Sequence, residues 1–406
     1  MTVSPARRIL AGLGLLLAGS GSALAADAQA FANRLKDVAA ANSIPLEFQG
    51  AEAAGDNVVL KGVSVGKGDD AARFGDVTFE TVTGSDAEGW KVARVPFRDV
   101  DTTEKGKHLA VSGMAIEGLQ LPQKEGTSKL PGESPYFFDS VTLGSLKVTD
   151  DGKDLFSLGA STFVNTVDTS DKINSQFSLG DFILKFPEND EAAKTLREIG
   201  YDQFNGNGSM EMSWDPKTGD TSVEPFQLTI ENAGDLAVSY AIGGYTPAFA
   251  RSLAAIRQQM AADPKAAQSS GMAIIGLLSQ LSVGSLEIGF SDASLAGKLL
   301  DYYSKKNGES REQLVSTLNQ MVTQTLAGLN NPAFQTEVAT AVDKFLKDPQ
   351  SLTIAVNPTQ PIPATQILGA AMGAPQTLPN VLQLQVTAND QTTDEPEDGD
   401  GAGTAQ

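Results

Sequence analysis

The sequence predicts an α+β protein built on a long, curved antiparallel β-sheet, groove-like or half-barrel-like, with a helical elaboration in the C-terminal half. Three observations predict this class. From about residue 44 to residue 244 apolar and polar residues alternate with the period of strands. Turn sequences rather than helices separate most of these strands, which favours hairpins over a doubly wound parallel sheet. From about residue 246 to residue 347 the apolar residues recur with a helical period.

The first residues have the features of a cleavable secretory signal peptide. Arg7 and Arg8 precede an apolar run over residues 9–18, and Ala23-Leu24-Ala25 matches the small-residue pattern of a cleavage site. The apolar run is shorter than the roughly 20 residues that a helix needs to span a bilayer. We therefore expect cleavage after Ala25, a mature chain without a transmembrane segment, and a location in the bacterial periplasm.

Composition excludes several kinds of chemistry. The chain has no cysteine, which removes disulfides, thiol catalysis and cysteine-bound metals. Lys and Arg number 30 against 50 Asp and Glu, for a formal net charge of −20. Such a field repels nucleic acid and anionic membrane surfaces, and no basic stripe compensates for it. Nucleic-acid binding is therefore not expected.

The strand region begins after a short predicted helix over about residues 27–41. Phe31, Leu35 and Val38 lie on one face of that helix, which either docks on the sheet or forms a loose tether. Strands are predicted, for example, over residues 57–65, 76–82, 109–116 and 140–148. The turn sequences over residues 150–153 and 215–220 indicate hairpins between strands.

A glycine followed by Ser or Asp recurs inside the predicted strands. The four instances are Phe74-Gly75-Asp76-Val77, Leu143-Gly144-Ser145-Leu146, Leu179-Gly180-Asp181-Phe182 and Val283-Gly284-Ser285-Leu286. Glycine within a strand often marks a bulge, a bend or a close backbone approach. The repetition suggests long strands that kink at corresponding levels, although chance among 40 glycines explains it equally well.

The helical block carries clear start signals. Thr246-Pro247 and Asn331-Pro332 each place an N-cap residue before a proline at the first helical position. Ser310 and Gln313 have the spacing of a capping box. Two apolar stripes follow, formed by Leu314, Val315, Leu318, Met321, Val322 and Leu326, and by Phe334, Val338, Val342 and Phe345. A single strand, over residues 283–290, interrupts the block.

These features divide the chain into five regions. They are a signal peptide (1–25), a β-rich region with an N-terminal helix (26–245), a mainly helical block with one strand (246–347), a returning β segment (348–388) and a disordered acidic tail (389–406). Within the returning segment, strands are expected over residues 352–356 and 381–386, and a short helix between residues 361 and 373. The tail contains acids and no base, and cannot bury enough apolar surface to order itself.

No motif in the sequence points to catalysis, a metal or a cofactor. The only histidine, His108, follows a predicted hairpin loop, without a nucleophile elbow elsewhere, and is expected on the surface. Trp90 and Trp214 are the only tryptophans, and for Trp214, on a predicted strand, packing is favoured over sugar stacking. The acidic sequences 150–154 and 398–401 lack EF-hand spacing and are interpreted as a hairpin turn and part of the tail. There is no phosphate-binding loop.

The apolar helices provide the candidate ligand-binding residues. If the helices leave an opening over the sheet, an acyl chain could occupy it, lined by Met260, Met272, Leu277, Leu278 and Met321. The alternative is that these side chains complete an ordinary hydrophobic core.

Part of the chain resembles the AsmA-like and YdgA-like envelope proteins of proteobacteria. The resemblance lies in the hairpin Ser213-Trp214-Asp215-Pro216-Lys217-Thr218-Gly219, which leads into the strand 226–230, and in the step Asn232-Ala233-Gly234-Asp235-Leu236 before the next strand. It extends over about residues 177–386. It implies a curved, groove-like sheet and a role in envelope homeostasis or lipid handling without enzymatic activity. The expected loss of the membrane anchor distinguishes this chain from those families.

The resulting functional expectation is a non-enzymatic periplasmic protein that binds a lipid or another apolar ligand. The alternative is an assembly factor whose sheet edge or acidic tail recruits an envelope protein. A third hypothesis, hydrolysis by paired carboxylates, requires two acids that face each other in a cleft.

Overall fold

The computed structural model describes residues 27–68, 71–188, 190, 191, 193–262 and 267–390. The predicted signal peptide and the tail beyond residue 390 lie outside this part of the chain. Within it, none of the helices has the length and hydrophobicity that crossing a membrane requires.

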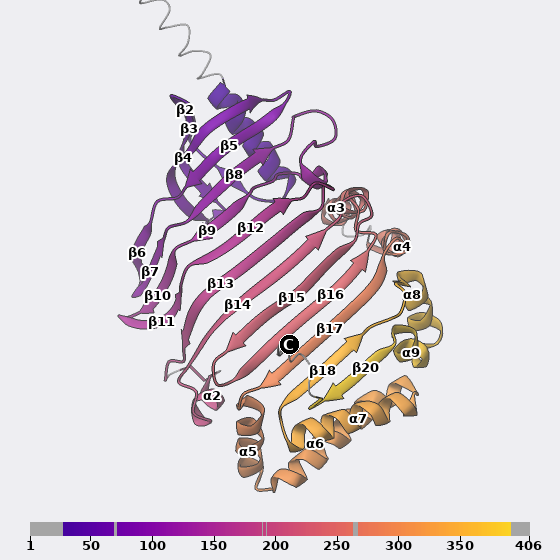
Figure 1. Cartoon of the computed structure of the whole chain (residues 1–406). Helices are drawn as coiled ribbons and strands as arrows, with labels where there is room; N and C mark the ends of the chain where they lie inside the picture. Colours follow the sequence, from indigo (N-terminus) through magenta and orange to yellow (C-terminus); the bar gives the residue numbers. More distant parts are fainter. Residues whose placement is uncertain (1–26, 69–70, 189, 192, 263–266, 391–406) are drawn as a thin grey trace, which may run out of the picture.

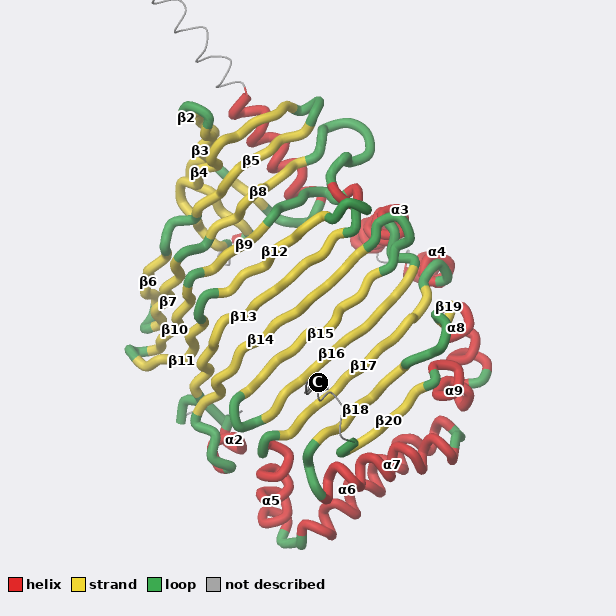
Figure 2. Tube along the Cα trace, viewed as in Figure 1, coloured by secondary structure: helices red, strands yellow, loops and turns green. Residues whose placement is uncertain are grey.

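The strands form one antiparallel sheet, 20-stranded in the described residues and not closed on itself (Figures 1 and 2). The strands are β1 (Leu46–Glu47), β2 (Gly50–Ala54), β3 (Asn57–Val65), β4 (Ala72–Ser85), β5 (Gly89–Pro96), β6 (Val100–Glu104), β7 (Lys107–Ser112), β8 (Ala115–Leu121), β9 (Ser140–Leu143), β10 (Ser145–Asp150), β11 (Lys153–Leu158), β12 (Ser161–Val167), β13 (Ile173–Lys185), β14 (Gln203–Trp214), β15 (Thr221–Ile230), β16 (Gly234–Gly243), β17 (Ser282–Asp292), β18 (Ser351–Val356), β19 (Ile362–Pro363) and β20 (Leu384–Ala388). The predicted fold class is confirmed.

Pairing runs across the sheet in the order β3, β4, β5, β8, β9, β12, β13, β14, β15, β16, β17, β18 and β20. A branch of β6, β7, β10 and β11 joins the second half of β13. The hairpin turn predicted over residues 150–153 joins β10 to β11, with Asp150 opposite Lys153.

The Gly-Ser/Asp motifs coincide with bends and register shifts. Gly144 separates β9 from β10, and a Cβ on Gly113 between β7 and β8 would lie 3.1 Å from the Gly144 Cα atom. The predicted strands 109–116 and 140–148 are therefore each divided at a glycine. Gly75, Gly180 and Gly284 lie at shifts in the β3–β4, β13–β14 and β16–β17 registers. The bulge interpretation of the motif is confirmed.

The N-terminal helix is docked on the sheet. Residues 27–41 are helical, and the fully buried Phe31 ring lies 5.1 Å from Phe79 and 5.7 Å from Trp90, measured between ring centroids. The Arg34 guanidinium donates to the Pro122 carbonyl at 2.9 Å and to the Gln123 carbonyl at 3.0 Å. The tether alternative is wrong, because these contacts hold the helix over the apolar side of β3, β4, β5 and β8.

The remaining helices lie in the C-terminal half, except for a short one after β13. They are α2 (Lys194–Glu198), α3 (Pro247–Ala262), α4 (Ala267–Leu278), α5 (Leu295–Asn307), α6 (Arg311–Leu326), α7 (Pro332–Lys347), α8 (Ala364–Gly373) and α9 (Leu378–Leu382). The Thr246 hydroxyl accepts from the Phe249 amide, Asn331 caps α7, and Ser310 and Gln313 form a capping box. The predicted helix starts are thus confirmed.

The end of the fold departs from two predictions. The last strand begins at Leu384 rather than Val381, because α9 occupies the preceding residues up to Leu382. Gln383, with a φ of 50°, caps the C-terminus of that helix. Asn389, assigned to the disordered tail, instead holds the chain: its Oδ1 accepts from the Ser351 amide at 3.1 Å and its Nδ2 donates to the Asp348 carbonyl at 2.7 Å. The fold therefore continues past the predicted boundary.

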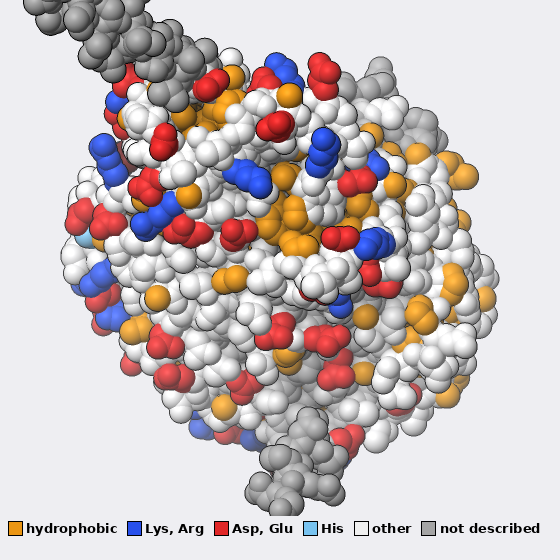
Figure 3. Space-filling view, turned by 45° about the horizontal axis from the view of Figure 1, so that its top comes forward, with side chains coloured by type: hydrophobic (Ala, Val, Ile, Leu, Met, Phe, Trp, Pro, Cys, Tyr) orange, Lys and Arg blue, Asp and Glu red, His pale blue; other side chains and the backbone are white. Residues whose placement is uncertain are grey.

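The two sides of the sheet differ in polarity. Figure 1 views the strands from the side away from α3 and α4, which lie behind them and are drawn fainter. Figure 3 tilts the same side, and its lower half carries scattered acidic side chains among uncharged polar ones. The apolar side chains of the strands point the other way, toward the side that holds helix 27–41 and α3.

The kink at Gly180 yields a stability prediction. A Cβ at this position would lie 2.3 Å from the Ala160 carbonyl oxygen, so Gly180→Ala should lower the free energy of unfolding by about 1–3 kcal/mol. Gly297 in α5 has open space around it, so Gly297→Ala should raise that free energy by about 1 kcal/mol. Urea denaturation measures both, and equal effects would contradict the close approach.

The bulge at Gly75 yields a pH prediction. Asp76 Oδ1 accepts from the Gly62 amide and Oδ2 from Lys61 Nζ, both at 3.1 Å, and these two bonds hold the pKa of Asp76 below its usual value. A lowered pKa adds stability above the unfolded value, about 3.9, which is lost as the pH falls through the folded value. The stability gap between the wild type and Asp76→Asn should therefore shrink below about pH 4. Glu88→Gln, an exposed turn variant, serves as the control.

Candidate functional site: an uncovered apolar face

Cross-strand register aligns one apolar residue from each strand in a row across the sheet. Residues that are paired opposite each other point to the same face. The row, called here the central row, consists of Val95, Ile116, Val141, Phe163, Phe177, Met210, Phe226, Val238, Ile288, Ile354 and Val386. Every member is apolar, although the strands that supply them are connected by hairpins, helices and long loops.

The rows beside the central row are also mainly apolar. On one side Leu179, Gly208, Leu228, Leu236, Phe290, Leu352 and Ala388 are partners in succession. On the other, Met212, Val223, Tyr240, Leu286, Val356 and Leu384 continue the surface. These rows and the central row together are called the apolar face. The opposite face carries Ser178, Ser209, Gln227, Ala237, Gly289, Thr353 and Thr387 in register.

In the described part of the chain, helices pack on the apolar face at its two lateral edges. Helix 27–41 covers the side of β5, where Val95 is 1% exposed, and α7 covers β20, where Val386 is 8% exposed, and also packs against Phe290 and Leu352. Between these edges the covering is incomplete: Ile288 and Ile354 are each 38% exposed, whereas Val223 and Val356 in the neighbouring row are 3% exposed. Large side chains that remain this open across neighbouring strands form the kind of apolar patch that marks a binding surface.

Two of the polar side chains on the face, Ser175 and Asn165, bond to each other. The Ser175 hydroxyl donates to Asn165 Oδ1 at 2.7 Å, and Asn165 Nδ2 donates to the Phe138 carbonyl at 3.0 Å. Apart from the Tyr240 hydroxyl, a ligand on the three rows of β15–β18 would therefore meet mainly carbon atoms. This chemistry suits an acyl chain.

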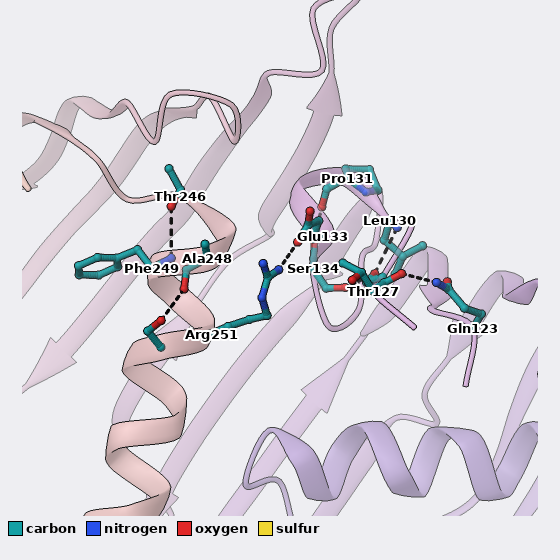
Figure 4. Close-up of polar contacts among 12 residues, drawn as sticks. Gln123, Thr127, Leu130, Pro131, Glu133, Ser134, Thr246, Ala248, Phe249 and Arg251 are labelled. Carbon is teal, nitrogen blue, oxygen red and sulfur yellow. Dashed lines mark hydrogen bonds and ion pairs between the residues drawn. The ribbon is translucent and has the colours of Figure 1, made fainter. Parts of the chain in front are cut away.

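One end of the face is bordered by α3 and the β8–β9 loop (Figure 4). The Trp214 indole donates to the Tyr245 carbonyl at 2.8 Å, and a Cβ on Gly132 in the loop would clash with the Trp214 ring. An ion pair between Arg251 of α3 and Glu133 ties the two elements together. A hollow between them, lined in part by Leu130, Val167 and Pro247, opens beside the end of β12.

The other end is bordered by α2 and α5. Buried Tyr201, which follows α2, donates its hydroxyl to the Asn232 carbonyl at 2.8 Å, and its ring lies 5.4 Å from that of Phe204. Lys298 Nζ of α5 lies 3.9 Å from the centre of the Tyr201 ring. Charged groups thus stand at the border of the apolar face and not on its central row.

The five candidate lining residues do not converge on one site. Half-buried Met260 is on α3, and α4 holds Met272, Leu277 and Leu278, which are 74% exposed, 6% exposed and half-buried. Met321 is 56% exposed on α6, which follows the far end of β17. The length of β17 separates it from the other four. The apolar face was not among the predicted sites, although the alternation that builds it was visible in the sequence.

The other residues considered as functional candidates take part in contacts that stabilise the fold. His108 Nε2 lies 2.8 Å from Asp101 Oδ1 on the β6–β7 hairpin. Trp214 packs against Tyr245 and the β8–β9 loop, as the packing interpretation predicts, and Trp90 is buried under helix 27–41. Asp154 pairs with Lys147 and Lys185, and the Lys147 bond lowers its pKa. Among the described residues, no three His, Asp or Glu side chains converge as metal ligands would. The sequence 398–401 lies outside the described part.

Comparison with known proteins adds one partial match. A family model described as "Uncharacterized protein" matches residues 227–389. The matched segment begins within β15 and ends one residue after β20, at Asn389, so its end coincides with the residue that closes the fold. No curated protein matches the chain.

Proposed function

We propose that this protein binds the acyl chains of a lipid on the uncovered part of the apolar face, in an extracytoplasmic compartment and without catalysing a reaction. The observation that carries the proposal is the central row, apolar at every position and open to solvent over β17 and β18. Burying apolar area is worth roughly 25 cal/mol per Å², so an acyl chain lying across several strands has a substantial driving force. The predicted signal peptide supports the compartment.

The non-enzymatic part of the proposal is supported by the surroundings of the polar groups. His108 has an exposed carboxylate as its partner at a hairpin. Asp215 and Asp220, which both border a second hollow where β15 begins and β16 ends, accept from the Lys217 amide and the Thr218 hydroxyl within their own turn. These acids therefore stabilise the β14–β15 connection, which leaves the carboxylate-hydrolase hypothesis without a specific observation in its favour.

The assembly-factor hypothesis receives less support than lipid binding. The edge strand β6 is short and carries Asp101 and Glu104, a pattern that discourages strand addition. On β20, Glu337 of α7 accepts from the Val386 amide at 3.1 Å, so a side chain occupies part of that edge. The kinship with AsmA-like and YdgA-like proteins remains a proposal, consistent with the open sheet.

Charges placed on the apolar face should abolish ligand binding. The double variant Ile288→Asp/Ile354→Asp should lower the affinity for a fluorescent fatty acid such as cis-parinaric acid at least tenfold, because each new carboxylate would have to be desolvated under the ligand. Thr353→Asp and Gln385→Asp, on the opposite face, are the matched controls. Fluorescence titration measures the affinities, and circular dichroism checks the fold. A wild type that takes up no fatty acid would refute the proposal.

The two tryptophans should report differently on the ligand. Trp214 lies at the end of the apolar face and Trp90 lies beneath helix 27–41. In Trp90→Phe the remaining indole should change its emission when fatty acid binds, whereas in Trp214→Phe the emission should stay constant. The reverse pattern would place the ligand elsewhere in the molecule.

A further inference from the structure

Two segments that form one flank of the described structure contain no charged residue. No Asp, Glu, Lys or Arg occurs from residue 266 to residue 286, or from residue 349 to residue 389. These segments contain α4, α8 and α9, which lie together at the right of Figure 1. On the right of Figure 3 the surface is almost entirely white and orange, whereas red and blue side chains are spread over the rest of the view.

The flank also presents the most exposed large apolar side chains of the described residues. Met372 of α8 is 79% exposed and Met272 of α4 is 74% exposed, with Ile275 of α4 at 40%. Flexible, unbranched methionine suits an irregular apolar partner. The two helices meet at the same end of β17, where the Ala364 amide at the start of α8 donates to the carbonyl of Leu281, three residues after α4, at 2.9 Å.

The flank borders the apolar face. β17 begins at Ser282, shortly after α4 ends at Leu278. Its Val283 pairs with Ile362, two residues before α8 begins. Val283 also pairs with Ile242, which follows Tyr240 on the same face of β16. A lipid that left a bilayer at α4 and α8 would therefore reach the apolar face without passing a charged side chain of these segments.

The distribution of charge indicates which kind of partner would bind to the flank. A chain of net charge −20 is repelled by anionic surfaces, and a basic protein partner would be drawn to the acidic remainder of the molecule. The neutral flank with projecting methionines is instead suited to the interface of a lipid bilayer. We propose that α4 and α8 form a bilayer-docking surface. Its role in passing lipid to the apolar face rests on the proposed function, whereas the docking itself does not.

Vesicle flotation tests the docking, with the chain from Ala26 onward, which contains the whole described fold. The wild type should float with phosphatidylcholine vesicles, and less with vesicles rich in phosphatidylglycerol at low salt, because its acidic surface is repelled. Met272→Asp/Met372→Asp should lower the partition coefficient at least tenfold. Met321→Asp, which adds a single carboxylate at the exposed methionine on α6, should stay within twofold of the wild type, whereas Met272→Asp alone should already lower the partition coefficient.

Three results would overturn the docking surface: no flotation of the wild type, equal loss in the Met321→Asp control, or a dimer-to-monomer shift of the double variant in sedimentation, which would make the flank an interface between two copies. Fatty-acid titration separates the two proposals. The flank variant should still bind soluble fatty acid, and Ile288→Asp/Ile354→Asp should float with vesicles while failing to bind it.

Discussion

The alignment of apolar residues across the paired strands is the constraint from which the rest of the structure follows. Register in an antiparallel sheet decides which side chains share a face, and a slip of one residue would send each of them to the other side. Here the register keeps Phe177, Met210, Phe226 and Val238 in one row, although these residues come from strands with different connections. Such a sheet has an apolar side that must be covered, either by other elements of the chain or by a ligand.

The chain covers that side only where it has helices available. Helix 27–41 closes one lateral edge with Phe31, and α7 closes the other with Phe334 and Phe345. The aromatic side chains of Trp214 and Tyr201 pack at the two ends of the long strands. Each donates a hydrogen bond to a backbone carbonyl. The middle remains open, and the side chains there shield one another only in part. An exposed apolar area framed by well-packed elements is more consistent with a binding surface than with an incomplete core.

Glycine and aspartate provide the bends that such long strands need. At Gly144 and Gly113 two backbones approach more closely than side chains would permit, and at Gly180 an added methyl group would meet a carbonyl oxygen. Asp76 then fixes the neighbouring bulge by accepting from a backbone amide and a lysine. At Gly75-Asp76, bending and fixing are thus assigned to adjacent residues.

Local patterns in the sequence were sufficient for most of the strands, for the turns and for the helix caps. Alternation, turn chemistry and capping at Ser310 and Asn331 depend on residues a few positions apart, and the structure confirms them. The sequence also pointed to an apolar ligand, but assigned it to helix side chains such as Met272 and Met321, which the fold places at opposite ends of β17. What covers a sheet face depends on where segments far apart in the chain meet. Only the tertiary structure could decide that helix 27–41 docks, that Asn389 closes the fold, and that the centre of the apolar face stays open.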